Sequence, residues 1–247
     1  MIFDTITIIA ILIAFALGGI LKGATGAGAP IVTIPVIAAF YDVRVAVIIM
    51  VIPNLLTNIG QIYQFRKTIL PSFFTVSFAI GGGIGAFVGT ILLANLSIKI
   101  LTLSVAFIVI IYIFLKLIVP SWKLMYEKAT KLVFILGAAG GVLQGTAGLS
   151  APISITFLNA MKLERNQFIP TISVYFGVMS IFQMPTLYYY DFLNFEIIIA
   201  SLVSTIVLLS FMPIGSWIAK SVSKEKFDKI TLILLAFIAV RIIYLNL

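Results

Sequence analysis

Two glycine-rich stretches interrupt the apolar chain with the residue types that an anion site made of backbone requires. They are GGILKGATGAGAPI at residues 18–31 and GGVLQGTAGLSAPI at residues 140–153, and eight of their fourteen positions are identical. Glycine in a helix costs up to about 1 kcal/mol relative to alanine, whereas proline suits the first helical turn. Each stretch therefore predicts a helix that ends, an unwound segment and a new short helix. In the first stretch, we expect the break to lie between residues 22–23 and 29–30.

The new helix of each stretch would present free N–H groups and the positive end of its dipole to an anion. The second stretch should supply a mirror-image site, so that two half-helix N-termini converge near the middle of the membrane. The alternative is a packing kink, in which the glycines only allow helices to cross closely. The candidate substrate-binding residues of the two stretches are Lys22, Gly23, Thr25, Gly26, Gly28, Pro30, Gln144, Gly145, Thr146, Gly148, Ser150 and Pro152.

Lys22 adds a positive charge to the first break, and the matching residue of the second stretch is the neutral Gln144. A charged residue at membrane depth costs a few kcal/mol and usually marks a substrate or ion pathway. One cation beside two helix N-termini favours an anionic substrate. The competing interpretation is that Lys22 extends to a membrane surface.

Further polar residues lie on one face of the apolar segment that follows each break. Asn54, Asn58 and Gln61 have helical spacing, and Ser180 and Gln183 repeat part of the pattern. Of these, Asn58, Gln61 and Gln183 are candidate substrate ligands. The alternative is that they hold helices together through hydrogen bonds.

Two carboxylates lie near segment ends, each close to an arginine. They are Asp42, near Arg44, and Glu164, next to Arg165. We expect helix caps or interfacial ion pairs, while a part in proton coupling stays open.

The composition requires a membrane as the solvent for these segments. Of the 247 residues, 62% are hydrophobic and 10% are charged, against roughly 45–50% and about 25% in soluble domains. The apolar runs are long and do not alternate, which favours helices over a barrel. Cysteine and histidine are absent, so no disulfide, metal site or cofactor is expected. The net charge of +8 lies mainly between apolar runs, which fits topology signals rather than nucleic-acid binding.

Ten apolar segments follow one another along the chain, and the first is expected to remain as a membrane helix. Eight are long enough, or nearly so, to span a bilayer, while 29–41 and 151–162 are too short. The segments are 5–22, 29–41, 44–65, 70–95, 98–119, 131–146, 151–162, 165–189, 194–219 and 227–246.

The chain repeats itself at an offset of 122 residues, which predicts two transmembrane halves, 1–119 and 129–247, joined by a cytoplasmic linker at 120–128. Lys and Arg gather in the loops at 66–70, 116–131 and 220–229, whereas the loops at 96–98 and 190–196 hold few. Because cytoplasmic loops are rich in these residues, equivalent loops lie on opposite sides of the membrane. We therefore predict an all-α polytopic membrane protein of two inverted repeats, each of about five helical segments, with both termini outside.

A third glycine cluster, GGGIGAFVG at 81–89, places Gly81, Gly85 and Gly89 on one helix face. This spacing indicates close helix–helix packing and needs no role in binding.

The paired motifs LKGATGAGAPIVTIP and LQGTAGLSAPISI, about 120 residues apart, resemble those of the sulfite exporter TauE/SafE family. The resemblance covers essentially the whole chain. It implies a multi-pass membrane protein of bacteria or archaea that transports sulfite, organosulfonates or related anions, with a functional role for Gly23–Pro30 and Gly145–Pro152. Family motifs are commonly richer in glycine, near GxGGG, whereas this chain has Ala27, Ala29 and Ser150 at corresponding places.

These observations predict a secondary transporter, an exporter of a small anion, in the inner membrane of a prokaryote. No GxxxxGK[ST] loop occurs, so transport would depend on a gradient, with a proton or another ion as a possible coupling partner. A non-transporting membrane scaffold and an anion channel are the alternatives. An enzyme is not expected, since no catalytic pair is evident. The expected partners are the anion and the lipid bilayer, and the oligomeric state stays open.

Overall fold

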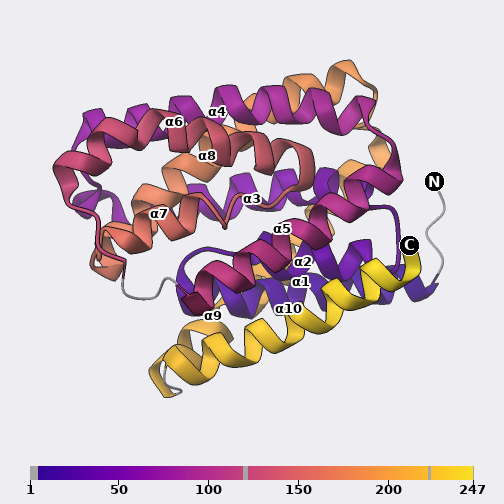
Figure 1. Cartoon of the computed structure of the whole chain (residues 1–247). Helices are drawn as coiled ribbons and strands as arrows, with labels where there is room; N and C mark the ends of the chain where they lie inside the picture. The colour runs from indigo at the N-terminus through magenta and orange to yellow at the C-terminus, as the bar shows by residue number, and fades with distance from the viewer. Residues whose placement is uncertain (1–4, 119–121, 222–223, 247) are drawn as a thin grey trace.

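The computed structural model describes residues 5–118, 122–221 and 224–246, and these residues fold into helices joined by short connections (Figure 1). The described parts contain no strand. The helices are α1 (Thr5–Thr25), α2 (Ala29–Ala38), α3 (Val43–Phe65), η1 (Arg66–Thr68), α4 (Ser72–Asn95), α5 (Ile98–Ile118), α6 (Tyr126–Ala147), α7 (Ser154–Ala160), α8 (Arg165–Tyr189), α9 (Phe195–Ser221) and α10 (Lys224–Asn246).

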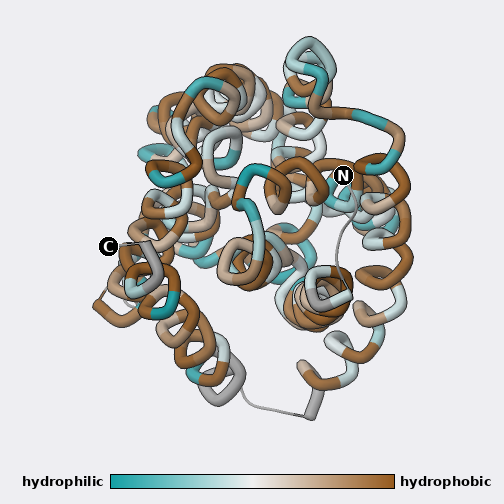
Figure 2. The backbone as a smooth tube through the Cα atoms, turned by 90° about the vertical axis from the view of Figure 1, so that its right-hand side faces the viewer, coloured by the Kyte–Doolittle hydropathy of each residue, from teal (hydrophilic) through white to brown (hydrophobic). Residues whose placement is uncertain are grey.

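Seven of the helices in the described residues are long and apolar enough to cross a membrane: α1, α3, α4, α5, α6, α8 and α9. The predicted all-α polytopic membrane protein is thereby confirmed. The sequence predicted eight long segments. The last of them, 227–246, forms most of α10, which has 23 residues but is not among these seven. Hydrophobic residues predominate along the helices (Figure 2). Many of them face outward, and Phe107 and Ile206 are each 65% exposed. Such an exterior suits lipid rather than water.

The glycine face of α4 packs against α6, as its spacing predicts. A Cβ on Gly81 would meet the carbonyl of Phe134, and a Cβ on Gly85 would overlap the backbone of Ala138. Residue numbers rise together along the two contacting faces, so α4 and α6 run parallel. The same holds for α1 and α9, where Gly19 lies against Leu208 and Gly23 against Met212. The small side chains let both pairs of backbones approach closely.

The centre of the bundle is the contact between α3 and α8, which run in opposite directions. Ser173 Oγ donates to Gln61 Oε1 at 3.1 Å, and Asn54 Nδ2 donates to Ser180 Oγ at 3.2 Å. Residue numbers therefore fall on α8 as they rise on α3. The beginning of α1 and the end of α10 lie at the same end of the bundle, on the right of Figure 1. The division into halves at 119 and 129 stays a prediction.

The charged residues near the segment ends act mainly as caps. Asp42 Oδ1 accepts from Arg44 N at 2.8 Å and caps the start of α3. Arg44 donates to the carbonyls of Leu93 and Leu96 at the end of α4. Glu164 stands at the N-cap position of α8 without a side-chain capping bond. The capping interpretation therefore holds for Asp42, whereas Glu164 provides no such bond.

Candidate functional site

The first glycine-rich stretch breaks the helix, as its sequence predicts. Helix α1 continues to Thr25, two or three residues beyond the expected end, and α2 starts at Ala29 with Pro30 in its first turn. Between them, Gly26 has a φ of 83° and Gly28 a φ of 91°. This left-handed conformation is accessible to glycine at little cost. Residues 26–30 are buried, so the break is enclosed by protein.

Side chains from the second half of the chain hold the end of α1. Gly23 O accepts hydrogen bonds from Arg165 Nη2 at 3.1 Å and from Ser216 Oγ at 3.0 Å. Thr25 Oγ1 donates to Leu21 O at 2.8 Å. The two bonds to Gly23 O satisfy a carbonyl that the helix end leaves without an intrahelical partner. Nothing in the sequence around Gly23 signals that Arg165 and Ser216 bind there.

The second break is not the mirror image that the sequence predicts. Helix α6 ends at Ala147, Gly148 has a φ of 69°, and α7 starts only at Ser154. Ile153 N donates to Ser150 O, as Ile31 N does to Gly28 O, but Thr156 N donates to Ala151 O, five residues back, and residues 151–153 form turns instead of helix. Pro152 therefore lies before α7, and α7 has only seven residues.

Both short helices fold back along the long helix that precedes them. Helix α2 begins beside Gly18, where an added Cβ would lie 3.2 Å from Ala29 O, and Thr33 Oγ1 donates back to Ala14 O. In the second half, Ser150 lies beside Gly140, the residue that matches Gly18. Both returns thus begin at equivalent depths. Convergence of the two helix starts stays a prediction.

Part of each glycine-rich stretch serves packing. A Cβ on Gly23 would overlap the carbonyl of Met212, and a Cβ on Gly145 would overlap the carbonyl of Ala86. Thr146 Oγ1 donates to Gly89 O of α4 at 3.2 Å. The contacts of Gly23, Gly145 and Thr146 therefore agree with the alternative interpretation, in which these residues allow helices to pack closely.

Lys22 lies inside the bundle, one turn before α1 ends. Its side chain is 1% exposed, and Nζ donates to Asn58 Oδ1 at 2.8 Å. Asn58 Nδ2 in turn donates to Asn54 O at 2.6 Å and Asn54 Oδ1 at 2.9 Å. The interpretation that Lys22 extends to a membrane surface is therefore wrong. The charge is buried against a neutral amide, which leaves it uncompensated among the described contacts.

Buried polar residues follow one another through the core on either side of Lys22. The bonds between α3 and α8 set the order, since the two helices are antiparallel and each turn advances about 5.4 Å. The side chains have an exposure of 6% or less. We call this series the polar file. From one end to the other it consists of Thr186, Gln183, Ser180 with Asn54, Lys22 with Asn58, and Ser173 with Gln61.

Two residues of this polar file, Gln183 and Thr186, and Gln144 of α6 have buried polar atoms without hydrogen-bond partners among the described residues. These atoms are Gln144 Oε1, both amide atoms of Gln183 and Thr186 Oγ1. Thr186 and Ser173 were not recognised from the sequence. Thr186 stands three residues after Gln183, a spacing that places both on one helix face, and this signal could have found it.

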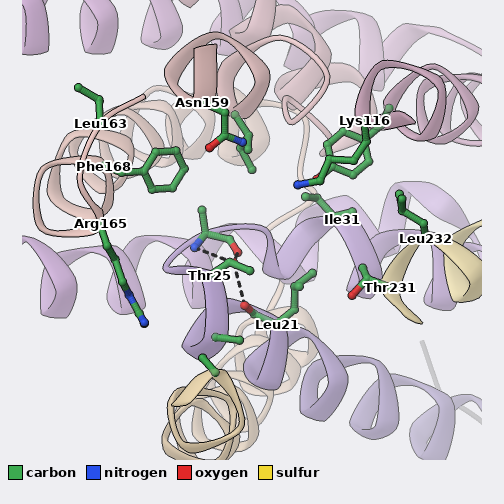
Figure 3. Close-up of a pocket in the computed structure, with 15 residues that line it drawn as sticks. Leu21, Thr25, Ile31, Lys116, Asn159, Leu163, Arg165, Phe168, Thr231 and Leu232 are labelled. Carbon is green, nitrogen blue, oxygen red and sulfur yellow. Dashed lines mark hydrogen bonds between the residues drawn. The ribbon is translucent and has the colours of Figure 1, made fainter. Parts of the chain in front are cut away.

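A cavity of about 340 Å³ leads from one end of the bundle to the first break (Figure 3). The side chains of Lys116 and Asn159 point into it, and its floor includes Leu21 and Thr25. Arg165, which binds Gly23 O, is also part of the wall. The cavity therefore combines two basic residues with the unwound segment beside Lys22. Among the predicted site residues, Thr25 lines it.

Comparison with known proteins gives one match. The model of the family described as Sulfite exporter TauE/SafE matches residues 10–242, which includes both breaks, the polar file and the cavity. No curated protein and no solved structure matches the chain.

Proposed function

Because the chain belongs to the sulfite exporter TauE/SafE family, it is a multi-pass membrane transport protein, and we propose that it is a secondary transporter that exports a small anion. Sulfite and organosulfonates are the substrate class.

The single observation that carries the proposal is the buried charge of Lys22 with the neutral Asn58 as its partner. A buried charge is expensive unless an opposite charge compensates it. An ammonium group has three N–H donors, and Asn58 uses one. A small anion beside Lys22 would accept from the remaining donors and neutralise the charge. A protein that only assembles others would gain nothing from this arrangement.

The cavity supports a route to that position. Lys116 and Arg165 would attract an anion from solution, and the wall continues to Thr25 and Ala27 at the break. The start of α2 lies at that break, and its dipole favours negative charge there. The anion would therefore move from a basic vestibule to the end of α2 and then to Lys22.

We propose alternating access as the transport mechanism, with residues 1–119 and 129–247 as inverted repeats and 120–128 as their linker. The antiparallel contact of α3 with α8 and the parallel pairs α4–α6 and α1–α9 support this division. In the described state the cavity extends to Leu21 and Thr25, next to Lys22, and Asn54 bonds to Ser180 on the other side of the lysine. Movement of one repeat against the other would reverse the opening.

The basic end of the bundle is proposed to face the cytoplasm of a prokaryotic cell, with both chain termini outside. Arg66, Lys67 and Lys123 lie at this end, as cytoplasmic loops require. The inside-negative potential then drives an anion outward by about 2.3 kcal/mol per charge per 100 mV. Export therefore needs no coupled cation, whereas uptake would.

The test is flux of labelled sulfite in proteoliposomes that contain only this protein. With an imposed potential, we expect saturable sulfite movement toward the positive side and exchange of internal for external sulfite. A pH gradient added separately shows whether protons are coupled. Flux without saturation or exchange would identify a channel, and no flux for sulfite or any organosulfonate would refute transport of this substrate class.

A further inference from the structure

Three side chains of the second half, Gln144, Gln183 and Thr186, have buried polar atoms without a hydrogen-bond partner in the part of the chain that the structure describes. They are 4%, 1% and 4% exposed, respectively. A buried polar atom without a partner costs about 1–3 kcal/mol, and native proteins retain few of them. Four such atoms occur among the described residues, and all belong to these three side chains, which indicates that something binds them.

The helix register brings Gln144 and Gln183 to the same depth, with Thr186 about one turn further along α8. Tyr175 Oη donates to Gly137 O at 2.9 Å, which aligns α8 with α6. Both helices run parallel to α4, since Gly82 contacts Tyr175 while Asn95 bonds to Tyr190.

From the contact between Tyr175 and Gly137, Gln144 is seven residues further along α6, and Gln183 is eight further along α8. At 1.5 Å per residue, both amides lie about 11 Å beyond that contact. Thr186 follows Gln183 by three residues, on the same helix face.

The chemistry of this cluster differs from that around Lys22. Three of the four unbonded atoms are oxygens, which coordinate hard cations. Gln144 also lies in the last turn of α6, which ends at Ala147. The carbonyls of a C-terminal turn and the negative end of the dipole stabilise positive charge. The first half differs, since Arg165 occupies the corresponding carbonyl of Gly23.

The absence of carboxylates restricts the cation. Among the residues that the structure describes, no group of three or more His, Cys, Asp or Glu side chains could hold a metal. Ca²⁺ and Mg²⁺ are usually bound through carboxylates, whereas neutral oxygens and helix C-termini bind Na⁺ in transporters. None of the three side chains titrates near neutral pH, so the cluster does not carry a proton.

We propose that Gln144, Gln183 and Thr186, with the terminal carbonyls of α6, form a Na⁺ site. The site rests on the proposed function for its purpose, since it lies in the same polar core as Lys22, about two helical turns along the bundle axis and beyond the Asn54–Ser180 bond. A cation bound there would add positive potential at the anion position beside Lys22. Na⁺ and the substrate anion would therefore bind cooperatively, while the membrane potential drives export.

The experiment measures Na⁺ binding on the purified full chain, without sulfite. Thermal unfolding is followed while NaCl replaces N-methylglucamine chloride at constant ionic strength, and binding of labelled Na⁺ is measured in parallel. We expect a saturable rise of the melting temperature by several degrees. Thr186→Val and Gln183→Leu should lose this rise. Thr205→Val is the matched control, because Thr205 is also 4% exposed but donates to Ser201 O within its own helix.

Gln183→Glu keeps the inference testable if the apolar variants fail to fold, because the added carboxylate should bind Na⁺ more tightly. The inference is overturned if Na⁺ does not raise the melting temperature, or if the rise persists in Thr186→Val. It is also overturned if sulfite without Na⁺ produces the same rise in the parent protein and this rise is lost in Thr186→Val. Sulfite flux distinguishes the two proposals. Flux without Na⁺ binding removes only the cation site, whereas Na⁺ binding without flux removes the anion function.

Discussion

Replacement of Lys22 by glutamine tests the central charge directly. The substitution replaces the ammonium group by a neutral amide, the same side chain that the equivalent position of the second half, Gln144, already has. Lys22 has two N–H groups beyond the one bound to Asn58. A hydrogen bond to a charged group contributes about 1.5–3 kcal/mol, so loss of one should weaken sulfite binding about 10- to 100-fold.

The stability of the fold should move little in this variant, which separates the charge effect from misfolding. A lysine at membrane depth costs about 2.5–3.5 kcal/mol on insertion scales, and the substitution removes that cost. Against this, Asn58 Oδ1 loses its charged donor, which costs about 1–3 kcal/mol if the glutamine does not replace it. The two effects offset each other, so the melting temperature should remain close to that of the parent protein.

The assay is concentration-dependent sulfite flux in proteoliposomes, with Lys99→Gln as the matched control. Lys99 is exposed, and its replacement lowers the net charge by the same unit. The double variant Lys22→Gln with Gln144→Lys moves the charge to the equivalent position and should recover part of the affinity. An unchanged KM for Lys22→Gln, or an equal rise for Lys99→Gln, would refute the role of the buried charge.

Three further predictions address the break, the cavity and the orientation. Gly23→Ala should destabilise the protein by about 1–3 kcal/mol, because the Cβ overlaps the Met212 carbonyl, whereas Gly60→Ala meets nothing within 4 Å and should be neutral or stabilising in thermal unfolding. Arg165→Met should raise the KM for sulfite about fivefold at low salt, which corresponds to a loss of about 1 kcal/mol of binding free energy. The difference in KM should shrink at high salt because salt screens the charge. An unchanged KM at low salt would argue against a role of Arg165 in attracting the anion. Because the chain has no cysteine, Asn159→Cys should react with an impermeant thiol reagent only from the cytoplasmic side and Asp191→Cys only from outside, while the reverse result would invert the proposed topology.

The fold and the break follow largely from local sequence. Glycine density and Pro30 ended one helix and began another because backbone conformational preferences act within a few residues. The spacing of Gly81, Gly85 and Gly89 indicated a packing face for the same reason, and α6 occupies it. The apolar composition determined that the elements would be membrane helices, since lipid leaves backbone groups no other partners.

The two repeats differ in where their short helices begin, and local sequence does not predict this difference. The copies are similar through Pro30 and Pro152, yet α2 starts at Ala29 and α7 only at Ser154. Ile31 and Ile153 donate alike to Gly28 O and Ser150 O, but in the second copy Thr156 N donates to Ala151 O, five residues back, so that turns replace the first helical residues. A repeat in sequence predicts the course of the backbone, but it does not predict which local bonds compete successfully in each copy.

The sequence by itself determined that this chain spans a membrane, breaks two of its helices and places a lysine at one break. Only the tertiary structure decided that Lys22 contacts Asn58 and that Arg165 binds Gly23 O. It also decided that Gln144 Oε1, the amide of Gln183 and Thr186 Oγ1 have no hydrogen-bond partner among the described residues. The reason is that these contacts join residues more than 30 positions apart, and their geometry depends on how α1, α3, α6 and α8 are aligned. Helix formation is decided by neighbouring residues, whereas the site is decided by the packing of helices against one another.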